Sequence, residues 1–387
     1  MSLLRRLVLA LAFAVSGLLP VAAMPMLLVD RDTLQVLYAE DAGQPWHPAS
    51  LTKLMTAYVA FEEIAKGTIT LDTPVTLSKA AFNLAPAKSG LPVGGTVTMK
   101  DALYILIVKS ANDIAMAIAE TIAGDEPRFV AKMNDVAQRM GLTATNFANS
   151  HGLHNPAQFT TARDMAIIAL YIEQSFPQYM PMFSTGAVRL GKTRLESQNG
   201  LLKGFAGAIG MKTGYICASG LNLVGSVDRN GKRLLAVVLG GSSGRERNER
   251  AAELLLKGLS GSAQATGQSV LNLANAVGRP PVDMRANICG KDASAYVKAQ
   301  EAAFPMGLKG QPSYLTDQIA LREYTAVDLG RIRTGIPIPR PRPAHTPVFA
   351  VEPALADASL NANLRPTLGT MGGSSVPFPR PRPAFMQ

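Results

Sequence analysis

The order of apolar segments in this 387-residue chain predicts an α+β fold, in which a helical subdomain is inserted between the strands of a sheet. Three observations support this prediction. Residues 25–29 and 34–38 are expected to form two strands joined by a short polar hairpin loop. Helix-like apolar runs then dominate up to about Glu173. Strand-like stretches rich in small and β-branched residues return after that point.

The first long helix is expected at residues 51–64 (LTKLMTAYVAFEEI), which are mostly apolar and contain no Pro or Gly. Ser50 lies at its start and Lys53 follows one turn later on the same face. A neutral lysine amine can activate a serine hydroxyl, but lysine normally keeps its proton up to about pH 10.4. Burial or a neighbouring cation must therefore lower the pKa of Lys53, and Lys212 is the candidate cation. Taken alone, S-x-x-K is more often a helix cap with a surface lysine.

A second polar element, Ser110-Ala111-Asn112, separates two apolar helix-like runs at residues 102–108 and 114–119. A polar turn between buried helices needs partners for its side chains. The Ser110 hydroxyl could relay a proton between Lys53 and a leaving amine, and the Asn112 amide could hold Lys53 and a substrate backbone. The alternative is an ordinary N-cap serine.

A third element, Lys212-Thr213-Gly214, lies between strand-like residues 205–211 and 220–227 and is expected on an edge strand. Gly214 has no side chain, which allows a substrate strand to come close to the backbone. Lys212 and Thr213 offer a cation and a hydroxyl to a carboxylate. A lone K-T-G is weak evidence, so the prediction depends on the three elements together.

The order S-x-x-K, S-x-N, K-T-G is the signature of penicillin-binding proteins and class A β-lactamases. The flanking sequences HPASLTKLMTAY, SANDIA, GLTATNFANSHGL, TTARDMA and GMKTGYICASGLNL resemble low-molecular-mass penicillin-binding proteins of the D-alanyl-D-alanine carboxypeptidase family, the S11 serine peptidases. The resemblance covers about residues 26–258. It implies a penicillin-binding protein or β-lactamase-like transpeptidase fold, with an antiparallel sheet and an inserted helical subdomain.

The resemblance also implies roles for individual residues. The catalytic set is Ser50 (nucleophile), Lys53 (general base), Ser110 (proton relay) and Asn112; the substrate-binding set is Lys212, Thr213, Gly214, Tyr215 and Arg247. The backbone N–H groups of Ser50 and Tyr215 would form the oxyanion hole. Arg247 resembles a family arginine that assists the substrate carboxylate. With Arg245 and Arg250 nearby, the alternative is the solvated start of a helix.

The implied function is that of a serine-type D-alanyl-D-alanine carboxypeptidase that removes the terminal D-Ala from peptidoglycan stem pentapeptides, in cell-wall organisation and cell shape. β-Lactams would be covalent inhibitors. The enzyme alternatives are a D,D-endopeptidase and a β-lactamase, although a class A β-lactamase also needs a glutamate for deacylation and no convincing loop supplies one. The alternative from another class is a catalytically quiet murein-binding scaffold.

Residues 1–23 are expected to form a signal peptide. Arg5 and Arg6 precede the apolar residues 7–19, and Val21-Ala22-Ala23 places small residues before the cleavage point. The apolar run is too short for a membrane span. We therefore expect an exported protein, periplasmic or secreted, whose catalytic domain comprises residues 24–258.

Residues 259–330 are expected to be a weakly structured linker, and residues 331–387 a disordered Pro/Arg-rich tail. In the tail, PIPRPRPA (337–344) recurs as PFPRPRPA (377–384). Such segments favour extended polyproline II and bury no core. The tail is either a spacer or a basic arm that contacts the anionic cell envelope weakly or binds a partner domain that recognises proline-rich ligands.

Two cysteines in an exported chain suggest a disulfide between Cys217 and Cys289, and the alternative is two free thiols. The four histidines lack metal-ligand spacing, so no metal or cofactor is expected. His151 and His154 are expected to be loop histidines with ordinary partners. Nucleic-acid binding would rest only on the net charge of +10, which is too little, so no nucleic-acid partner is expected.

Overall fold

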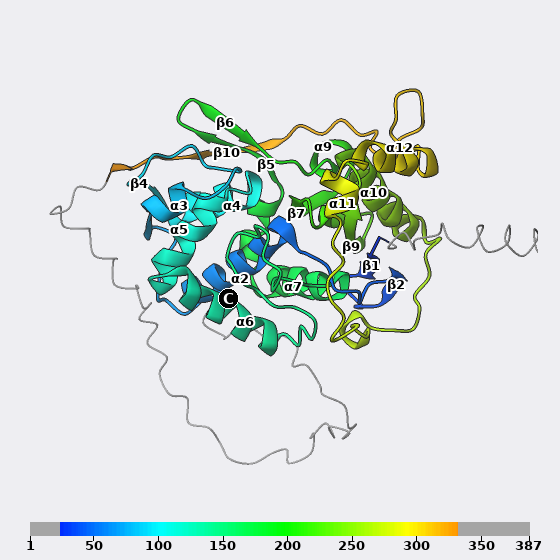
Figure 1. The fold of residues 1–387 in the computed structure, drawn as a ribbon, viewed down its shortest axis with the longest axis horizontal. Helices are drawn as coiled ribbons and strands as arrows, with labels where there is room; N and C mark the ends of the chain where they lie inside the picture. The colour runs from blue at the N-terminus through cyan, green and yellow to red at the C-terminus, as the bar shows by residue number, and fades with distance from the viewer. Residues whose placement is uncertain (1–23, 332–387) are drawn as a thin grey trace, which may run out of the picture.

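The computed structural model describes residues 24–331 (Figure 1). A five-stranded antiparallel sheet with strand order β2-β1-β9-β8-β7 forms its centre. The strands are β1 (Met26–Asp30), β2 (Val36–Glu40), β7 (Ala208–Ile216), β8 (Gly220–Arg229) and β9 (Lys232–Gly241). β7, which carries the K-T-G element, is the last strand of the sheet. The predicted opening hairpin and the predicted edge strand are both confirmed.

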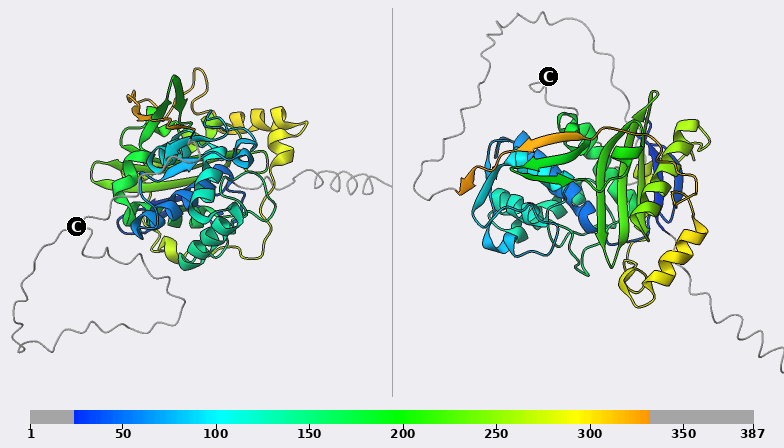
Figure 2. Two further views of the ribbon diagram at one scale, coloured as in Figure 1. Left: turned by 90° about the vertical axis from the view of Figure 1, so that its left-hand side faces the viewer. Right: turned by 90° about the horizontal axis from the view of Figure 1, so that it is seen from above.

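Both faces of this sheet are buried, and side chains alternate between them along each strand. On β9, Leu235, Val237 and Leu239 pack into the larger core, which the inserted helices supply. Their neighbours Leu234 and Val238 pack on the opposite face, against α10 (Gly244–Ser260). Figure 2 shows the sheet between α10 on one side and the helical subdomain on the other. The α+β architecture with an inserted helical subdomain is confirmed.

The chain between β2 and β7 supplies this subdomain. Its helices are η1 (Ala49–Leu51), α2 (Thr52–Ala65), α3 (Lys79–Phe82), α4 (Met99–Val108), α5 (Asn112–Ala123), α6 (Glu126–Arg139), α7 (Ala162–Ser175), η2 (Pro177–Tyr179), α8 (Met180–Phe183) and α9 (Leu201–Gly204). Polar caps fix the starts of several helices: the side chain of Thr98 accepts the Asp101 N–H on α4, and that of Thr161 accepts the Asp164 N–H on α7. α2 is buried on nearly all sides, in agreement with its mostly apolar sequence.

Two smaller sheets flank the helices. One has the order β10-β5-β6 and the other β11-β4-β3. Their strands are β3 (Pro74–Thr76), β4 (Gly95–Thr98), β5 (Thr185–Leu190), β6 (Thr193–Glu196), β10 (Arg322–Ala326) and β11 (Gly330–Arg331). None of the described helices is long and apolar enough to cross a membrane.

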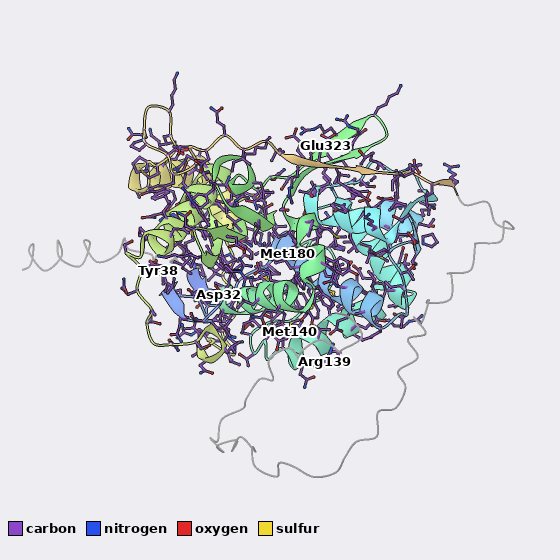
Figure 3. All side chains as sticks on the ribbon, turned by 180° about the vertical axis from the view of Figure 1, so that it is seen from behind. Asp32, Tyr38, Arg139, Met140, Met180 and Glu323 are labelled. Atoms are coloured by element: carbon purple, nitrogen blue, oxygen red, sulfur yellow. A yellow bond between two sulfur atoms is a disulfide. The ribbon has the colours of Figure 1, made fainter. Side chains whose placement is uncertain are left out.

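The prediction of a weakly structured linker at residues 259–330 is wrong. This segment contains η3 (Val270–Asn272), α11 (Arg285–Cys289), α12 (Ala293–Ala303) and β10. β10 pairs with β5, and Glu323 on β10 forms ion pairs with Arg189 and Arg194 (Figure 3). The boundary expected at residue 258 also falls inside the last turn of α10. Local composition was misleading because these elements are held by partners far away in the sequence.

The disulfide between Cys217 and Cys289 is present, with a Cα–Cα distance of 5.6 Å, so the alternative of two free thiols is wrong. It joins the chain just after β7 to the end of α11. The expected signal peptide and, apart from Arg331, the expected Pro/Arg-rich tail lie outside the described residues.

Candidate active site

Ser50 and Lys53 meet at the junction of η1 and α2. Lys53 is 1% exposed, and its Nζ lies 3.0 Å from Ser50 Oγ, 2.7 Å from Asn112 Oδ1 and 2.5 Å from the backbone oxygen of His151. Three segments from different parts of the chain therefore converge on one amine. A helix cap with a surface lysine, the common interpretation of S-x-x-K, is wrong here.

The environment of Lys53 favours its neutral form. Burial is the largest cause and the charge of Lys212 the second; together they lower the pKa of Lys53 well below its usual value, against a smaller opposing effect of Asp113. The expectation that burial and Lys212 would act on Lys53 is confirmed. A neutral amine beside a serine hydroxyl is the arrangement that nucleophile activation requires.

The S-x-N element brings its two polar residues to the same place. Ser110 has a left-handed backbone (φ 63°), and its buried Oγ has no hydrogen-bond partner among residues 24–331. Asn112 starts α5, and its Nδ2 donates to the backbone oxygen of Pro86. The N-cap of α5 is Ala111, with no capping side chain, so the N-cap interpretation of Ser110 is wrong. A buried hydroxyl without a partner is suited to take part in a proton transfer.

The edge strand β7 runs directly beside the nucleophile. A Cβ added to Gly214 would lie 3.0 Å from Ser50 N and 3.0 Å from the backbone oxygen of Pro48. A Cβ on Gly152, where φ is +89°, would lie 2.0 Å from the backbone oxygen of Ala49. Both glycines are needed because backbone approaches the Ser50 turn from two directions.

Lys212 on this strand and Arg247 on α10 form a buried pair of cations. Burial, followed by repulsion from Arg247, lowers the pKa of Lys212 to about 7, and burial lowers the pKa of Arg247 to about 10. Arg247 is 3% exposed and donates to the backbone oxygen of Gln198 and to Asn248 Oδ1, so it is not part of a solvated helix start. Two neighbouring buried cations repel each other, and an anionic ligand would offset this cost.

Sequence reasoning missed two groups that hold the Ser50 turn and Lys53. Asn222 on β8 donates through Nδ2 to the backbone oxygens of His47 and Pro48, and its Oδ1 accepts the Gly240 N–H. The other group is the backbone oxygen of His151, which accepts from Lys53 Nζ. The one available signal was a polar residue, Asn222, between the apolar residues Leu221 and Leu223 of β8.

The His151 ring has partners, as expected for a loop histidine. Its Nδ1 accepts the Leu153 N–H and its Nε2 faces Glu126 at 3.5 Å, while burial lowers its pKa to about 4. Within residues 24–331, no group of three or more His, Cys, Asp or Glu side chains could hold a metal ion.

A serine beside a buried lysine, at the junction of a helical subdomain and the edge of an antiparallel sheet, defines the class of active-site-serine acyl-transfer proteins. The sequence model of the D-alanyl-D-alanine carboxypeptidase family, Peptidase S11, matches residues 13–243. The chain belongs to this family.

Among curated relatives, the D-alanyl-D-alanine carboxypeptidase DacD of Salmonella typhimurium is 37% identical over 235 residues, or 59% of this chain and 60% of the relative. DacF of Bacillus subtilis is 34% identical over 232 residues, with shares of 59% and 60%. The chain thus spans about 60% of the length of these relatives.

Solved structures confirm the predicted fold. Penicillin-binding protein 5 of Haemophilus influenzae superposes with a TM-score of 0.58 at 34% identity, covering 63% of this chain and 73% of that one. The Streptomyces K15 DD-transpeptidase superposes with a TM-score of 0.57 at 30% identity, covering 62% of this chain and 97% of that one. The central sheet and inserted helical subdomain are therefore those of the penicillin-binding proteins.

Proposed function

We propose that this protein is a serine-type D-alanyl-D-alanine carboxypeptidase that removes the terminal D-Ala from peptidoglycan stem pentapeptides. The observation that carries the proposal is the buried amine of Lys53 beside Ser50 Oγ, next to the K-T-G strand. The relatives are named D-alanyl-D-alanine carboxypeptidases, and these names supply the substrate class. Peptidoglycan stem peptides would be the natural partner, and penicillins would acylate the same serine.

Hydrogen bonding around Lys53 supports a role as general base. A neutral amine has two N–H groups and one lone pair. Asn112 Oδ1 and the His151 backbone oxygen can accept the two N–H groups, which leaves the lone pair for the Ser50 hydroxyl. Ser50 Oγ would then attack the penultimate D-Ala carbonyl while its proton passes to Lys53.

The negative charge that forms on the carbonyl oxygen in this attack needs hydrogen-bond donors. Ser50 N lies at the start of a helical segment, beside Gly214, and the proposed oxyanion hole consists of the backbone N–H groups of Ser50 and Tyr215. As the tetrahedral intermediate collapses, the terminal D-Ala leaves as an amine and takes a proton from Lys53, with the unpartnered Ser110 hydroxyl as relay. Water then attacks the Ser50 ester, with Lys53 again acting as base, and releases the shortened peptide.

Recognition of the substrate would depend on its terminal carboxylate. Lys212 and Thr213, on the strand that the peptide would follow, provide a positive charge and a hydroxyl donor, and Arg247 on α10 provides a second positive charge. Charge-assisted bonds to one carboxylate would place the preceding carbonyl beside Ser50. This requirement explains why two cations are buried together.

An enzyme that acts on peptidoglycan would work in the periplasm or outside the cell. It would have a role in cell-wall organisation and cell shape. The predicted signal peptide at residues 1–23 supports export. The basic Pro/Arg-rich tail would at most add a weak contact with the anionic envelope. Deletion of residues 332–387 is expected to leave binding to peptidoglycan sacculi unchanged if the tail is only a spacer.

The decisive experiment is release of free D-alanine from a pentapeptide ending in D-Ala-D-Ala. Purified wild type is expected to release it, Ser50→Ala is not, and the exposed-site control Ser262→Ala is expected to match wild type. A labelled penicillin should mark wild type and Ser262→Ala but not Ser50→Ala. No release with labelling of Ser50 would contradict the carboxypeptidase and indicate a cross-linked substrate. Neither release nor labelling would favour the scaffold.

A further inference from the structure

The proposed function, on which this inference rests, fixes the direction of a bound peptide along β7. The carboxylate lies at Lys212 and Thr213, and the scissile carbonyl lies at Tyr215. The peptide must therefore run antiparallel to β7, and the residue before D-Ala-D-Ala continues past Tyr215 towards Cys217. Residues in a strand are about 3.3 Å apart, so this residue lies level with the Cys217–Cys289 disulfide.

That end of β7 is bordered by a segment that comes from beyond the catalytic core. Residues 282–289 return to the active-site side of the sheet, where Val282 N donates to the backbone oxygen of Pro45 and Met284 N to that of Ala218. The Met284 side chain is buried, and its sulfur would lie 2.9 Å from a Cβ placed on Gly220. The segment then forms α11, drawn next to β7 in Figure 1.

After Met284 the segment packs on the core through Ile288 and Tyr296 and is tied to its surroundings at two further points. Cys289 is joined to Cys217, and Tyr215 Oη lies 3.5 Å from Cys289 Sγ. Further along, Arg245 on α10 donates to the backbone oxygen of Phe304. α11 therefore belongs to a strap between Met284 and Phe304, and within residues 24–331 the disulfide is its one covalent link to the substrate strand.

The Tyr215 side chain links this strap to the peptide path. It is 50% exposed although its backbone belongs to the buried K-T-G strand, and its hydroxyl is directed at the disulfide. An exposed aromatic ring fixed against a rigid cross-link offers a contact surface that loses little entropy on binding. Reduction would remove the covalent support behind the ring, leaving α11 attached through the buried Met284 and through Ile288 on the core.

We propose that Tyr215, the Cys217–Cys289 disulfide and α11 form a wall that contacts the substrate residue preceding D-Ala-D-Ala, and that this wall gives the enzyme its preference for extended stem peptides over short ones. The disulfide holds the wall in place. The assigned role is specificity for the acyl side of the substrate, distinct from the carboxylate site at the other end of the strand.

The test compares kcat/KM for the pentapeptide with kcat/KM for N-acetyl-D-Ala-D-Ala, which is too short to reach the wall. The variant is Cys217→Ser/Cys289→Ser. We expect the ratio of the two kcat/KM values to fall about tenfold in this variant. It should fall equally in wild type treated with a thiol reductant. The reductant should leave the ratio of the double variant unchanged, which controls for effects elsewhere.

A kcat/KM ratio within twofold of wild type would contradict the proposed role of the wall, whether both activities persist or both fall together. The disulfide would then be only a stabilising cross-link. If the double variant does not fold, reduction and reoxidation of wild type provide the same comparison. Failure of the proposed function is distinguishable, because wild type would then release D-alanine from neither peptide, and the inference would fall with it.

Discussion

Lys53 and Lys212 are both buried, and the charge of Lys212 acts on Lys53, yet their surroundings differ. Lys53 Nζ is within hydrogen-bond distance of Ser50 Oγ, Asn112 Oδ1 and the backbone oxygen of His151. Among the described residues, the Nζ of Lys212 hydrogen-bonds only to the backbone oxygen of Thr213. One amine has all its bonding positions used within the protein, and the other has donors left over.

This difference separates a base from a binding group. Full coordination by uncharged acceptors holds the Lys53 lone pair towards Ser50, and burial with the charge of Lys212 keeps its pKa low. The spare donors of Lys212, next to Arg247, suit a ligand that brings its own negative charge. The same residue type can therefore perform different tasks when its partners differ. Three predictions test this division, and a fourth tests the turn that carries Ser50.

The largest effect is expected for Lys53→Met, which keeps the length of the side chain and removes the base. Loss of a general base costs about 10²–10⁴ in rate, so acylation of Ser50 by a labelled penicillin should slow about a thousandfold. The matched control, Lys192→Met in the exposed turn between β5 and β6, should label at the wild-type rate. Slowing of less than tenfold would mean that another group removes the serine proton.

Lys212→Ala should impair binding of the carboxylate more than the chemistry. Loss of a hydrogen bond to a charged group costs about 1.5–3 kcal/mol, so kcat/KM for a peptide with a free carboxylate should fall about a hundredfold. Hydrolysis of the matching peptide amide, which lacks that charge, should fall much less. Equal losses on both substrates would contradict the division between base and binding group.

Asn222→Ala tests whether the turn that carries Ser50 needs its anchor. The change leaves the backbone oxygens of His47 and Pro48 and the Gly240 N–H without their partner. Unpaired buried polar groups cost about 1–3 kcal/mol each, so the free energy of unfolding should fall by about 2–4 kcal/mol in urea melts. Penicillin acylation should also slow, about tenfold. Unchanged acylation in a destabilised protein would limit Asn222 to a structural role.

The smallest expected effect concerns pH. Lys212 has a pKa lowered to about 7, so its charged form is present below this value and is lost as pH rises through it. Carboxylate binding should therefore weaken above pH 7, whereas Lys53 becomes more active as a base when pH rises. Arginine stays protonated, so Lys212→Arg should raise the ratio of kcat/KM at pH 9 to that at pH 7 several-fold. Superimposable pH profiles would exclude Lys212 as the titrating group.

Local spacing determined much of the site in advance. Ser50 and Lys53 face each other because residues three apart share a helix face, and the position of Gly214 on an edge strand follows from small and β-branched neighbours. The alternation of helical and strand periods likewise predicted the α+β class. These properties depend on residues that are close together in the sequence.

Properties that depend on distant partners were decided only by the tertiary structure. The low pKa of Lys53 requires burial and the charge of Lys212, the anchoring role of Asn222 requires backbone from the Ser50 turn, and the choice between a disulfide and free thiols required the distance from Cys217 to Cys289. The ordered segment after α10 was missed for the same reason, because its strands and caps are completed by β5 and α10. Local sequence determines which elements form, whereas burial, charge proximity and cross-linking arise only when those elements pack together.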